Sequence, residues 1–231
     1  MTLEARAAGP EQMDAADLDP ATYAAILRDL AAVNRLTMAK RPTLGFIQRG
    51  LAGRKRFRLL DVGFGEGDML RAIATGAKTR GIEADLVGID LNPGSAPAAQ
   101  VATPADMHIA YRTGDYRSLA GEEFDFVVSS LVAHHMDDAE LIDFLRFMEA
   151  EARIGWMVND LHRHRLAHFG YPILARLMRW HRIVREDGTL SIARSFRSAE
   201  WAEMLTKADI PKGAARIARR FPFRLCVERT R

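Results

Sequence analysis

Arg58-Leu-Leu-Asp-Val-Gly-Phe-Gly-Glu-Gly-Asp68 is the stretch from which the fold of this chain can be predicted. Its apolar beginning predicts a short buried strand, and the pattern from Met69 to Ala77 predicts a helix directly after it. Alternating glycines join the two elements. They let the backbone turn sharply and let a ligand approach the N–H groups that gather at a helix start. A strand, a glycine turn and a helix in this order indicate a nucleotide-binding unit.

The spacing of the glycines separates two ligand classes. A dinucleotide fold has the pattern G-x-G-x-x-G, which would require glycine at position 68, where this chain has Asp68. The chain instead places Asp61 at the strand end, before the pattern G-x-G-x-G. This arrangement resembles the first motif of class I S-adenosylmethionine-dependent methyltransferases. The resemblance implies that Asp61, Gly63, Gly65 and Gly67 surround the cofactor, S-adenosylmethionine.

Two further predicted strands end near acidic residues. Leu86-Val-Gly-Ile-Asp90 reads as a strand that ends in a carboxylate, and a carboxylate there can bind both ribose hydroxyls. Asp115 follows a third strand, at the position where members of the family place an acidic side chain near the adenine amino group. The other residues that we expect around the cofactor are Leu91, Tyr116, Ser130 and Arg35.

Strand and helix patterns alternate along most of the chain, which predicts an α/β fold with a parallel sheet and helices on both faces. The strands of this alternation are expected at 58–62, 85–90, 108–112, 124–129 and 154–158. Candidate strands at 214–219 and 223–229 follow. The resemblance implies a Rossmann-like, seven-stranded methyltransferase sheet, mostly parallel and closed by a C-terminal antiparallel hairpin.

The chain is expected to form one domain with additions, since 231 residues and 48% hydrophobic residues supply material for one core. Residues 1–53 are expected to form an N-terminal arm and cofactor-covering helices. Residues 1 to about 17 lack a clear period and read as a loose arm, and Asp19-Pro20 then begins an amphipathic helix. The core domain is expected over 54–231, with a lid insertion at about 161–186.

The lid segment after the fifth strand combines apolar residues with arginines, and we expect it to be helical and to end at a loop, 185–188. Its apolar face could cover an apolar acceptor, while the arginines contact water or a phenolate. A transient contact of the same basic segment with a membrane surface is an alternative. The candidate substrate-binding residues are His164, Phe169, Tyr171 and Trp180.

Histidines follow the fourth and fifth predicted strands, where ligands bind in open α/β sheets. Methyl transfer from a sulfonium depends on orientation, and a neutral histidine can remove the proton of a phenolic acceptor. The candidate catalytic residues are therefore His135, His134 and His162, with His135 ranked first. Adjacent histidines cannot both point into one pocket, so we expect only one of His134 and His135 to act.

We expect no catalytic metal. Asn159-Asp160 resembles part of the magnesium site of catechol methyltransferases, but the end of the fourth strand offers Ser129 and Ser130 and no carboxylate. An Asn/Asp-Pro-Pro-Tyr/Phe element, by which many base and amide N-methyltransferases bind a planar amino group, is also missing after that strand. This argues against adenine or glutamine methylation.

Three longer motifs narrow the resemblance. They are Val33-Asn-Arg-Leu36, Val158-Asn-Asp-Leu161 and Asp187-Gly-x-x-Ser191-x-x-Arg194-x-Phe196. They resemble small bacterial methyltransferases associated with aromatic polyketides, phenolic lipids and quinone-like rings, although His162 and His164 depart from the commonest form. The resemblance implies O-methylation of a small apolar aromatic secondary metabolite. The alternatives are C-methylation of a quinone or polyketide ring, RNA methylation and a noncatalytic cofactor-binding subunit.

Composition limits the partners and the location. The net charge of +3 does not indicate a nucleic-acid binder, and a single cysteine, Cys226, excludes an intramolecular disulfide. The N-terminus lacks an apolar signal core, and no apolar run reaches the roughly 18 residues of a membrane span. We therefore expect a cytoplasmic monomer or homodimer that binds a small aromatic substrate and no nucleic acid.

Overall fold

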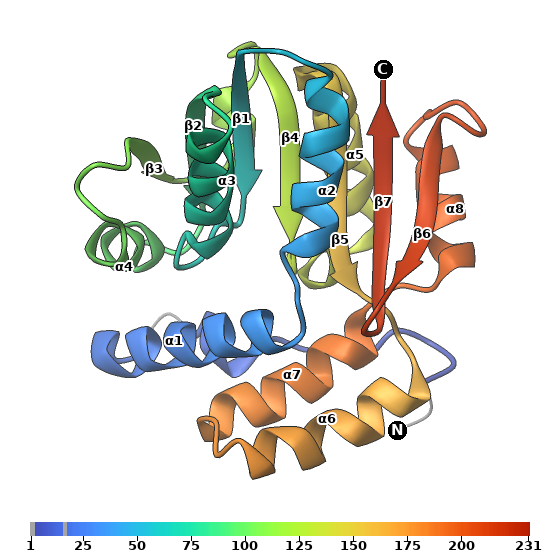
Figure 1. Ribbon diagram of the computed structural model, residues 1–231. Coiled ribbons are helices and arrows are strands. Elements are labelled where there is room, and N and C mark those ends of the chain that lie inside the picture. Colours follow the sequence, from blue (N-terminus) through green and yellow to red (C-terminus); the bar gives the residue numbers. More distant parts are fainter. Residues whose placement is uncertain (1–2, 16–17) are drawn as a thin grey trace.

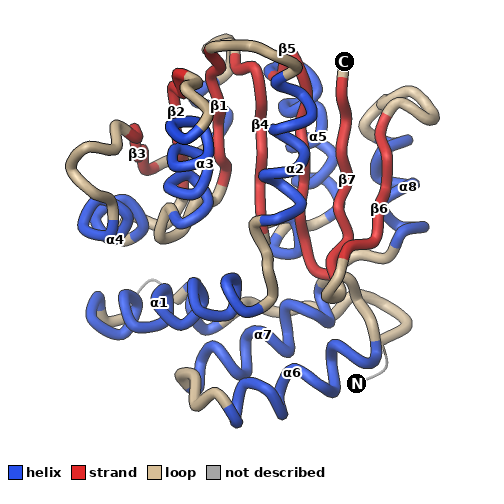
Figure 2. The backbone as a smooth tube through the Cα atoms, in the orientation of Figure 1, coloured by secondary structure: helices blue, strands red, loops and turns tan. Residues whose placement is uncertain are grey.

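The computed structural model describes residues 3–15 and 18–231, and it is built around one seven-stranded sheet (Figures 1 and 2). The strand order is β3-β2-β1-β4-β5-β7-β6. Strands β1 to β5 run parallel, and β7 runs antiparallel to both β5 and β6. The predicted Rossmann-like methyltransferase sheet with its C-terminal hairpin is therefore confirmed. The strands are β1 (Arg56–Val62), β2 (Glu83–Asp90), β3 (Ile109–Thr113), β4 (Phe124–Ser130), β5 (Ala152–Leu161), β6 (Ala215–Arg220) and β7 (Arg224–Thr230).

Helices cover both faces of the sheet, as the strand and helix alternation predicted. Successive residues of β1 point to opposite faces, so Leu59 joins one core cluster and Leu60 the other. The Leu59 side is covered by α2 (Arg41–Leu51), α3 (Asp68–Thr79) and α4 (Ser95–Ala102). The Leu60 side is covered by α5 (Asp138–Glu151) and α8 (Ser198–Lys207).

A third layer of helices lies beyond the carboxyl ends of the parallel strands, below the sheet in Figure 1. It consists of α1 (Pro20–Leu36), α6 (Arg165–Leu177) and α7 (Arg182–Arg194), which share a small apolar cluster. Helix α1 begins as predicted, with Asp19 as the N-cap that accepts a hydrogen bond from the Thr22 N–H. The predicted helical lid segment corresponds to α6 and the start of α7. No described helix has both the length and the apolar character that a membrane span needs.

The loop expected at 185–188 is wrong, because α7 continues through these residues. Gly188 is the reason for the misreading. A Cβ atom at Gly188 would lie 2.4 Å from the ring of Tyr171, so glycine there allows α6 and α7 to pack closely. A glycine that resembles a turn signal in the sequence is a helix-packing residue in the fold.

The N-terminal arm is packed against the domain, contrary to the expected loose segment. Leu3 is buried, and the guanidinium of Arg6 stacks 3.7 Å above the centre of the Phe196 ring. The short helix η1 (Gln12–Asp14) is attached to α7 because the Gln12 and Met13 N–H groups donate to the Asp187 carboxylate. Residues 1–2 and 16–17, which belong to the expected arm, lie outside the described residues.

We expect Gly155→Ala to destabilise the fold by about 2–3 kcal/mol, because a Cβ atom in β5 would lie 2.3 Å from the backbone oxygen of Arg229. Gly170→Ala is the matched control. It adds the same methyl group in α6, where nothing lies within 4 Å, and should stabilise by up to about 1 kcal/mol. Urea unfolding of both variants measures the difference, and equal stability of the two variants would contradict the close packing of β5 against β7.

Candidate active site at the carboxyl edge of the sheet

The glycine turn after β1 lies at the carboxyl edge of the sheet, and its glycines have positive φ angles of 75°, 55° and 75° at Gly63, Gly65 and Gly67. A Cβ at Gly63 would lie 2.2 Å from Val132, and one at Gly67 would lie 2.6 Å from the hydroxyl of Tyr111. Among the described residues, only an atom of Leu27 lies as near as 4.0 Å to a Cβ placed at Gly65. The turn is therefore closely packed at its two ends and has space at its centre.

Asp90, at the end of β2, is bound to the glycine turn. Its Oδ2 accepts a hydrogen bond of 2.9 Å from the Gly65 N–H, and its Oδ1 accepts one of 2.9 Å from the Asn92 N–H. These bonds fix the orientation of the carboxylate beside the turn. The two most specific motifs of the sequence thus meet at one point, although twenty-five positions separate Gly65 from Asp90.

Asp61 lies beneath the glycine turn and is 1% exposed. Its Oδ2 has no hydrogen-bond partner among the described residues. Burial, followed by the charges of Asp68 and Asp90, raises the pKa of Asp61 well above its usual value. Asp68 of this carboxylate group forms an ion pair with Lys40, at 3.1 Å. A positively charged ligand beside the turn would offset the repulsion among these carboxylates.

Helix α1 lies over the glycine turn. Its Tyr23 hydroxyl is hydrogen-bonded to the buried Ser95 Oγ of α4 at 3.0 Å, and its Leu27 approaches Gly65. Nothing in the local sequence distinguishes Tyr23 from the other apolar residues of this helix. Arg35, near the end of the helix, is exposed, and the adjacent Asn34 has a buried Oδ1 without a hydrogen-bond partner in the described part of the chain.

The other predicted cofactor residues have mixed surroundings. Leu91 is 74% exposed beside Asp90. Asp115 caps the short helix η2 (Tyr116–Leu119), because its Oδ1 accepts from the Arg117 N–H at 2.8 Å. The Tyr116 ring packs against two phenylalanines of α5. Ser130, at the end of β4, donates to the Asn159 backbone oxygen at 3.4 Å. Cofactor contacts of these residues stay predictions.

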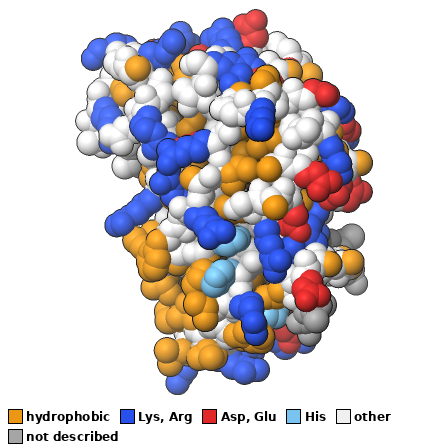
Figure 3. Space-filling model, turned by 90° about the vertical axis from the view of Figure 1, so that its right-hand side faces the viewer, with side chains coloured by type: hydrophobic (Ala, Val, Ile, Leu, Met, Phe, Trp, Pro, Cys, Tyr) orange, Lys and Arg blue, Asp and Glu red, His pale blue; other side chains and the backbone are white. Residues whose placement is uncertain are grey.

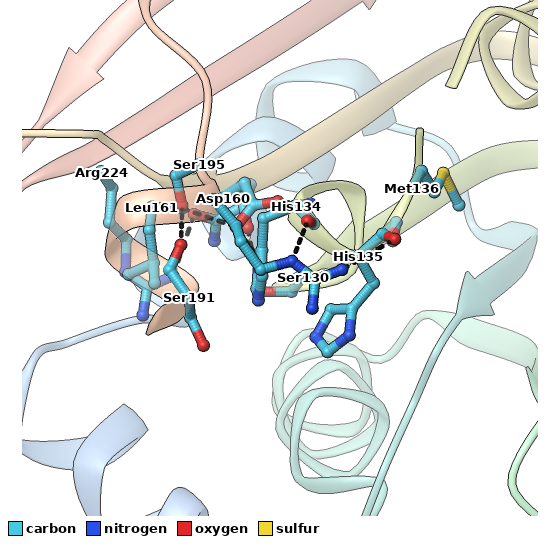
Figure 4. Close-up of polar contacts among 12 residues, drawn as sticks. Ser130, His134, His135, Met136, Asp160, Leu161, Ser191, Ser195 and Arg224 are labelled. Carbon is cyan, nitrogen blue, oxygen red and sulfur yellow. Dashed lines mark hydrogen bonds and ion pairs between the residues drawn. The ribbon is translucent and has the colours of Figure 1, made fainter. Parts of the chain in front are cut away.

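His134 is buried between two carboxylates in the short helix η3 (Ala133–His135), directly after β4. Its Nδ1 lies 2.7 Å from Oδ1 of Asp160, and its backbone N–H donates to the other oxygen of Asp160 at 2.9 Å. Its Nε2 lies 3.5 Å from Glu11 Oε1. Figure 4 shows Asp160 beside His134, and the imidazole of His135 pointing away from Asp160.

The pKa values in this group indicate a charged array. Burial alone would lower the pKa of His134, but Asp160 and then Glu11 raise it to about 9. Burial alone would raise the pKa of Glu11, but the hydrogen bond and charge of His134 keep it below the usual value. The pKa of Asp160 is lowered in the same way by His134. His134 is therefore an imidazolium at neutral pH, and a protonated histidine cannot accept the proton of an acceptor.

His135 differs from its neighbour, because its side chain is 27% exposed and its Nε2 lies 3.7 Å from Glu11 Oε2. Two arginines hold the backbone around it. Arg194 donates to the His134 oxygen at 3.1 Å and to the His135 oxygen at 3.0 Å, and Arg6 donates to the Met136 oxygen at 2.7 Å. Of the two adjacent histidines, His135 is the one that has both a carboxylate partner and access to solvent.

The motif from Asp187 to Phe196 acquires a physical explanation here. Asp187 binds η1 of the arm, and Ser191 Oγ donates to Glu11 Oε1 at 2.8 Å. Arg194 holds the η3 carbonyls, and Phe196 lies under the guanidinium of Arg6. Each of these side chains fixes either the arm or η3. Sequence reasoning found the motif but missed Glu11 and Arg6, the arm residues to which it binds.

The residues that resembled half of a magnesium site have other partners. Asn159 and Asp160 lie within β5, which extends beyond the strand end expected at 158. The Asn159 amide donates to the Ala39 oxygen at 2.7 Å and to Thr43 Oγ1 at 3.1 Å, while Asp160 binds His134. Among the described residues, Glu11, His134 and His135 form a group whose ligand atoms lie within 4.8 Å of one another. Arg194, 3.8 Å from Glu11, adds a positive charge beside that group.

His162 and His164 lie where β5 meets the start of β7. The His162 N–H donates to the Phe223 oxygen at 2.9 Å, and the His164 ring stacks on the Phe223 ring at 5.1 Å. Burial, followed by the charge of Arg219, lowers the pKa of His162. His164 Nδ1 also accepts from the Leu166 N–H and caps α6. The contacts of this histidine pair are with β7 and α6, and those of the η3 pair are with the arm, α7 and β5.

The predicted substrate residues of the lid fall into two groups. Tyr171 stacks on Trp180 at 6.2 Å, and its hydroxyl donates to the Val184 oxygen, so both residues pack between the helices. Burial raises the pKa of Tyr171 well above its usual value. Phe169 is 62% exposed on the outer side of α6. Substrate contacts of these residues stay predictions.

We expect the stability effect of His134→Gln to depend on pH. The folded-state pKa of about 9 lies above the unfolded value of 6.5, so protonation of His134 stabilises the fold. This contribution is complete below pH 6.5 and is lost as the pH rises through 9. The loss of unfolding free energy caused by the substitution should thus be larger by about 3 kcal/mol below pH 6.5 than above pH 9.

Urea unfolding across this pH range measures the effect as the difference between wild type and variant, which cancels the titration of other groups such as Asp61. His108→Gln is the control, since His108 is exposed and should show no such trend. A difference for His134→Gln that does not change with pH would contradict the charged array.

Comparisons with known proteins agree with this geometry. Residues 60–149 match a family model described as "Methyltransferase domain". No curated protein sequence matches the chain significantly. The matched residues contain the glycine turn, Asp90 and η3.

Solved structures with the same fold include several methyltransferases. Magnesium protoporphyrin IX methyltransferase from Synechocystis PCC 6803, with bound SAH, is 14% identical, with 95% of this chain and 91% of that chain covered and a TM-score of 0.58. The plantazolicin methyltransferase, with a triazolic substrate analogue and SAH, is 16% identical, with 88% and 91% covered and a TM-score of 0.64. Human N-acetylserotonin methyltransferase with SAM is 12% identical, with 92% and 56% covered and a TM-score of 0.64.

Each of these three solved structures contains SAM or SAH. Residues 60–149 match a methyltransferase domain, and the described chain has the Rossmann-like methyltransferase fold.

Proposed function

We propose that this chain transfers a methyl group from S-adenosylmethionine to a hydroxyl of a small apolar aromatic metabolite. The observation that carries the cofactor assignment is the contact between the glycine turn and Asp90, above the buried Oδ2 of Asp61, which has no hydrogen-bond partner within residues 3–15 and 18–231. The residues fit this cofactor, because its sulfonium and ammonium groups are cations and the site gathers carboxylates. Backbone N–H groups of the turn would face its carboxylate, and Asp90 would bind its ribose.

Residues 1–53 are proposed to cover the bound cofactor. The support is the position of α1, which is held to α4 by Tyr23 and lies against the turn through Leu27. The N-terminal arm packs at the same carboxyl edge of the sheet, where Glu11 lies beside His135 and Arg6 donates to the Met136 oxygen. Exclusion of water and fixed orientation are the main ways in which a protein accelerates methyl transfer, so a covering layer at this edge suits the reaction.

We propose His135 as the general base. The cofactor supplies an electrophilic methyl group when it is bound, so the protein has only to orient the acceptor and remove its proton. His135 is partly exposed beside η3, and Glu11 would stabilise the imidazolium that forms when the ring accepts the hydroxyl proton. His134 would keep Glu11 ionised and fixed in place. His162 has no carboxylate within the contacts described for it and is the weaker candidate.

The aromatic acceptor is proposed from the motifs at 33–36, 158–161 and 187–196 and from the apolar helical layer beyond the site. The acceptors named for the solved relatives, which include magnesium protoporphyrin IX, N-acetylserotonin and plantazolicin, differ too widely to transfer to this chain. C-methylation of a quinone or polyketide ring uses the same base and is the alternative. Product NMR distinguishes a methoxy group from a ring methyl group.

We expect Asp90→Asn to weaken S-adenosylmethionine binding roughly tenfold to a hundredfold, because charge-assisted hydrogen bonds to the ribose contribute about 1.5–3 kcal/mol. Asp85→Asn is the matched control at the opposite end of β2, where Asp85 pairs with Arg58 at 3.0 Å, and should leave binding unchanged. Calorimetry measures both dissociation constants. Unchanged binding by Asp90→Asn would remove the ribose assignment.

We expect His135→Ala to lower the rate of methyl transfer by about 10² to 10⁴, with cofactor affinity unchanged. The assay incubates the protein with S-adenosylmethionine that carries an isotopically labelled methyl group and with an extract of the source organism, and mass spectrometry identifies the labelled product. His108→Ala, an exposed histidine before β3, is the control and should retain full activity. A wild-type rate in His135→Ala would overturn the role of His135 as general base. Label that appears only in RNA would overturn the small-molecule acceptor.

A further inference from the structure

The outer side of α6 is apolar although it faces solvent. The side chains that form this surface, called here the α6 stripe, are exposed by 68%, 62%, 70% and 78% at Leu166, Phe169, Ile173 and Leu177. They recur at helical spacing, while Ala167, Tyr171 and Ala175 of the same helix pack inward. A contiguous apolar surface of this kind is unusual for a protein face in water and indicates a binding surface.

A groove lined by arginines runs beside the α6 stripe. It lies between α6 and α7, has a volume of about 430 Å³ and is lined by Pro172, Arg176, Arg182, Arg185, Glu186 and Thr189. Arg182 pairs with Glu186 at 3.2 Å. The Nε atom of Arg185 is buried and has no hydrogen-bond partner among the described residues. An unsatisfied guanidinium nitrogen in such a groove indicates a site for an anion such as a phosphate.

The charge around the stripe is mainly positive, although Glu186 lies in the groove. Residues 165–185 include five arginines and no acidic residue. Arg165, Arg176, Arg179 and Arg182 are all exposed. Figure 3 shows hydrophobic side chains gathered on the lower part of one face of the molecule, with Lys and Arg side chains beside them. An apolar helix face flanked by arginines is the pattern of a helix that lies in the interface of a membrane with anionic lipids.

Charge also decides against the simplest other occupant, a second copy of the chain. Two α6 stripes facing each other across a two-fold axis would bring the same arginines of both copies together, and like charges at close range repel. An anionic lipid surface provides the opposite charge. It also provides phosphate groups for the groove and hydrocarbon for the stripe.

We propose that the α6 stripe and the neighbouring arginine groove bind the surface of an anionic phospholipid membrane, with a lipid phosphate in the groove. Leu166, Phe169, Ile173 and Leu177 enter the interface, and Arg176, Arg182 and Arg185 contact the headgroups. In this orientation α1 and α7 lie between the lipid and the sheet, so the candidate active site is on the side of α6 that faces away from the lipid. The binding does not depend on the identity of the methyl acceptor.

The test is co-sedimentation of the full chain with vesicles of phosphatidylcholine, with and without phosphatidylglycerol. We expect binding to the vesicles that contain phosphatidylglycerol and its loss at high salt, because the attraction to anionic lipid is screened. Ile173→Ser with Leu177→Ser should weaken binding at least roughly tenfold, since both side chains leave water in the bound state. Arg176→Gln with Arg182→Gln should weaken it about 25-fold, or about fivefold for each arginine.

Val101→Ser is the matched control, because Val101 is 90% exposed on α4, away from the stripe, and its substitution should not change binding. All these positions are at the surface, so the variants should fold as the wild type does, which circular dichroism verifies. Equal binding to neutral vesicles would remove the role of the arginines. No binding to anionic vesicles would overturn the proposal. So would a wild-type dimer in light scattering that Ile173→Ser with Leu177→Ser converts to a monomer, since the stripe would then be a contact between copies.

Discussion

The buried contact of His134 with Asp160 and Glu11 is the interaction on which the rest of the site depends. It joins three parts of the chain that are far apart in sequence: the N-terminal arm, the turn after β4 and the end of β5. A buried carboxylate is costly without a partner, and the imidazolium satisfies one on each side. Removal of any member would leave a buried charge uncompensated, so the array fixes the arm and η3 together.

This arrangement separates the roles of two adjacent histidines. His134 is held in its charged form by its carboxylates, whereas His135 lies beside Glu11 and keeps access to solvent. His134 can therefore act as a structural ion and His135 as a candidate base, because the two side chains have different surroundings. Arg194 and Arg6 hold the carbonyls of the same short helix, which limits how far His135 can move.

The helical layer beyond the sheet has two sides with different chemistry. Its inner side, with Tyr171 and Trp180, packs against α1 and so supports the helix that lies over the glycine turn. Its outer side carries the α6 stripe and exposed arginines. One layer thus connects the candidate active site to the surface at which we propose that the protein meets lipid. The apolar acceptor proposed here is of a kind that also partitions into such a surface.

The strands, the glycine turn and the place of Asp90 could be predicted from the sequence, because these depend on local patterns: apolar strands, alternating glycines and a carboxylate at a strand end. The seven-stranded sheet with its hairpin was implied by the resemblance to class I methyltransferases. The start of α1 at Asp19 could be predicted from the sequence as well. The partners of His134 follow only from the packing of the fold, since Glu11 lies in a segment without periodicity and no local signal joins it to η3. Gly188 was misread for the same reason. It allows the Tyr171 ring to pack closely against α7, and this contact arises only when α6 packs on α7.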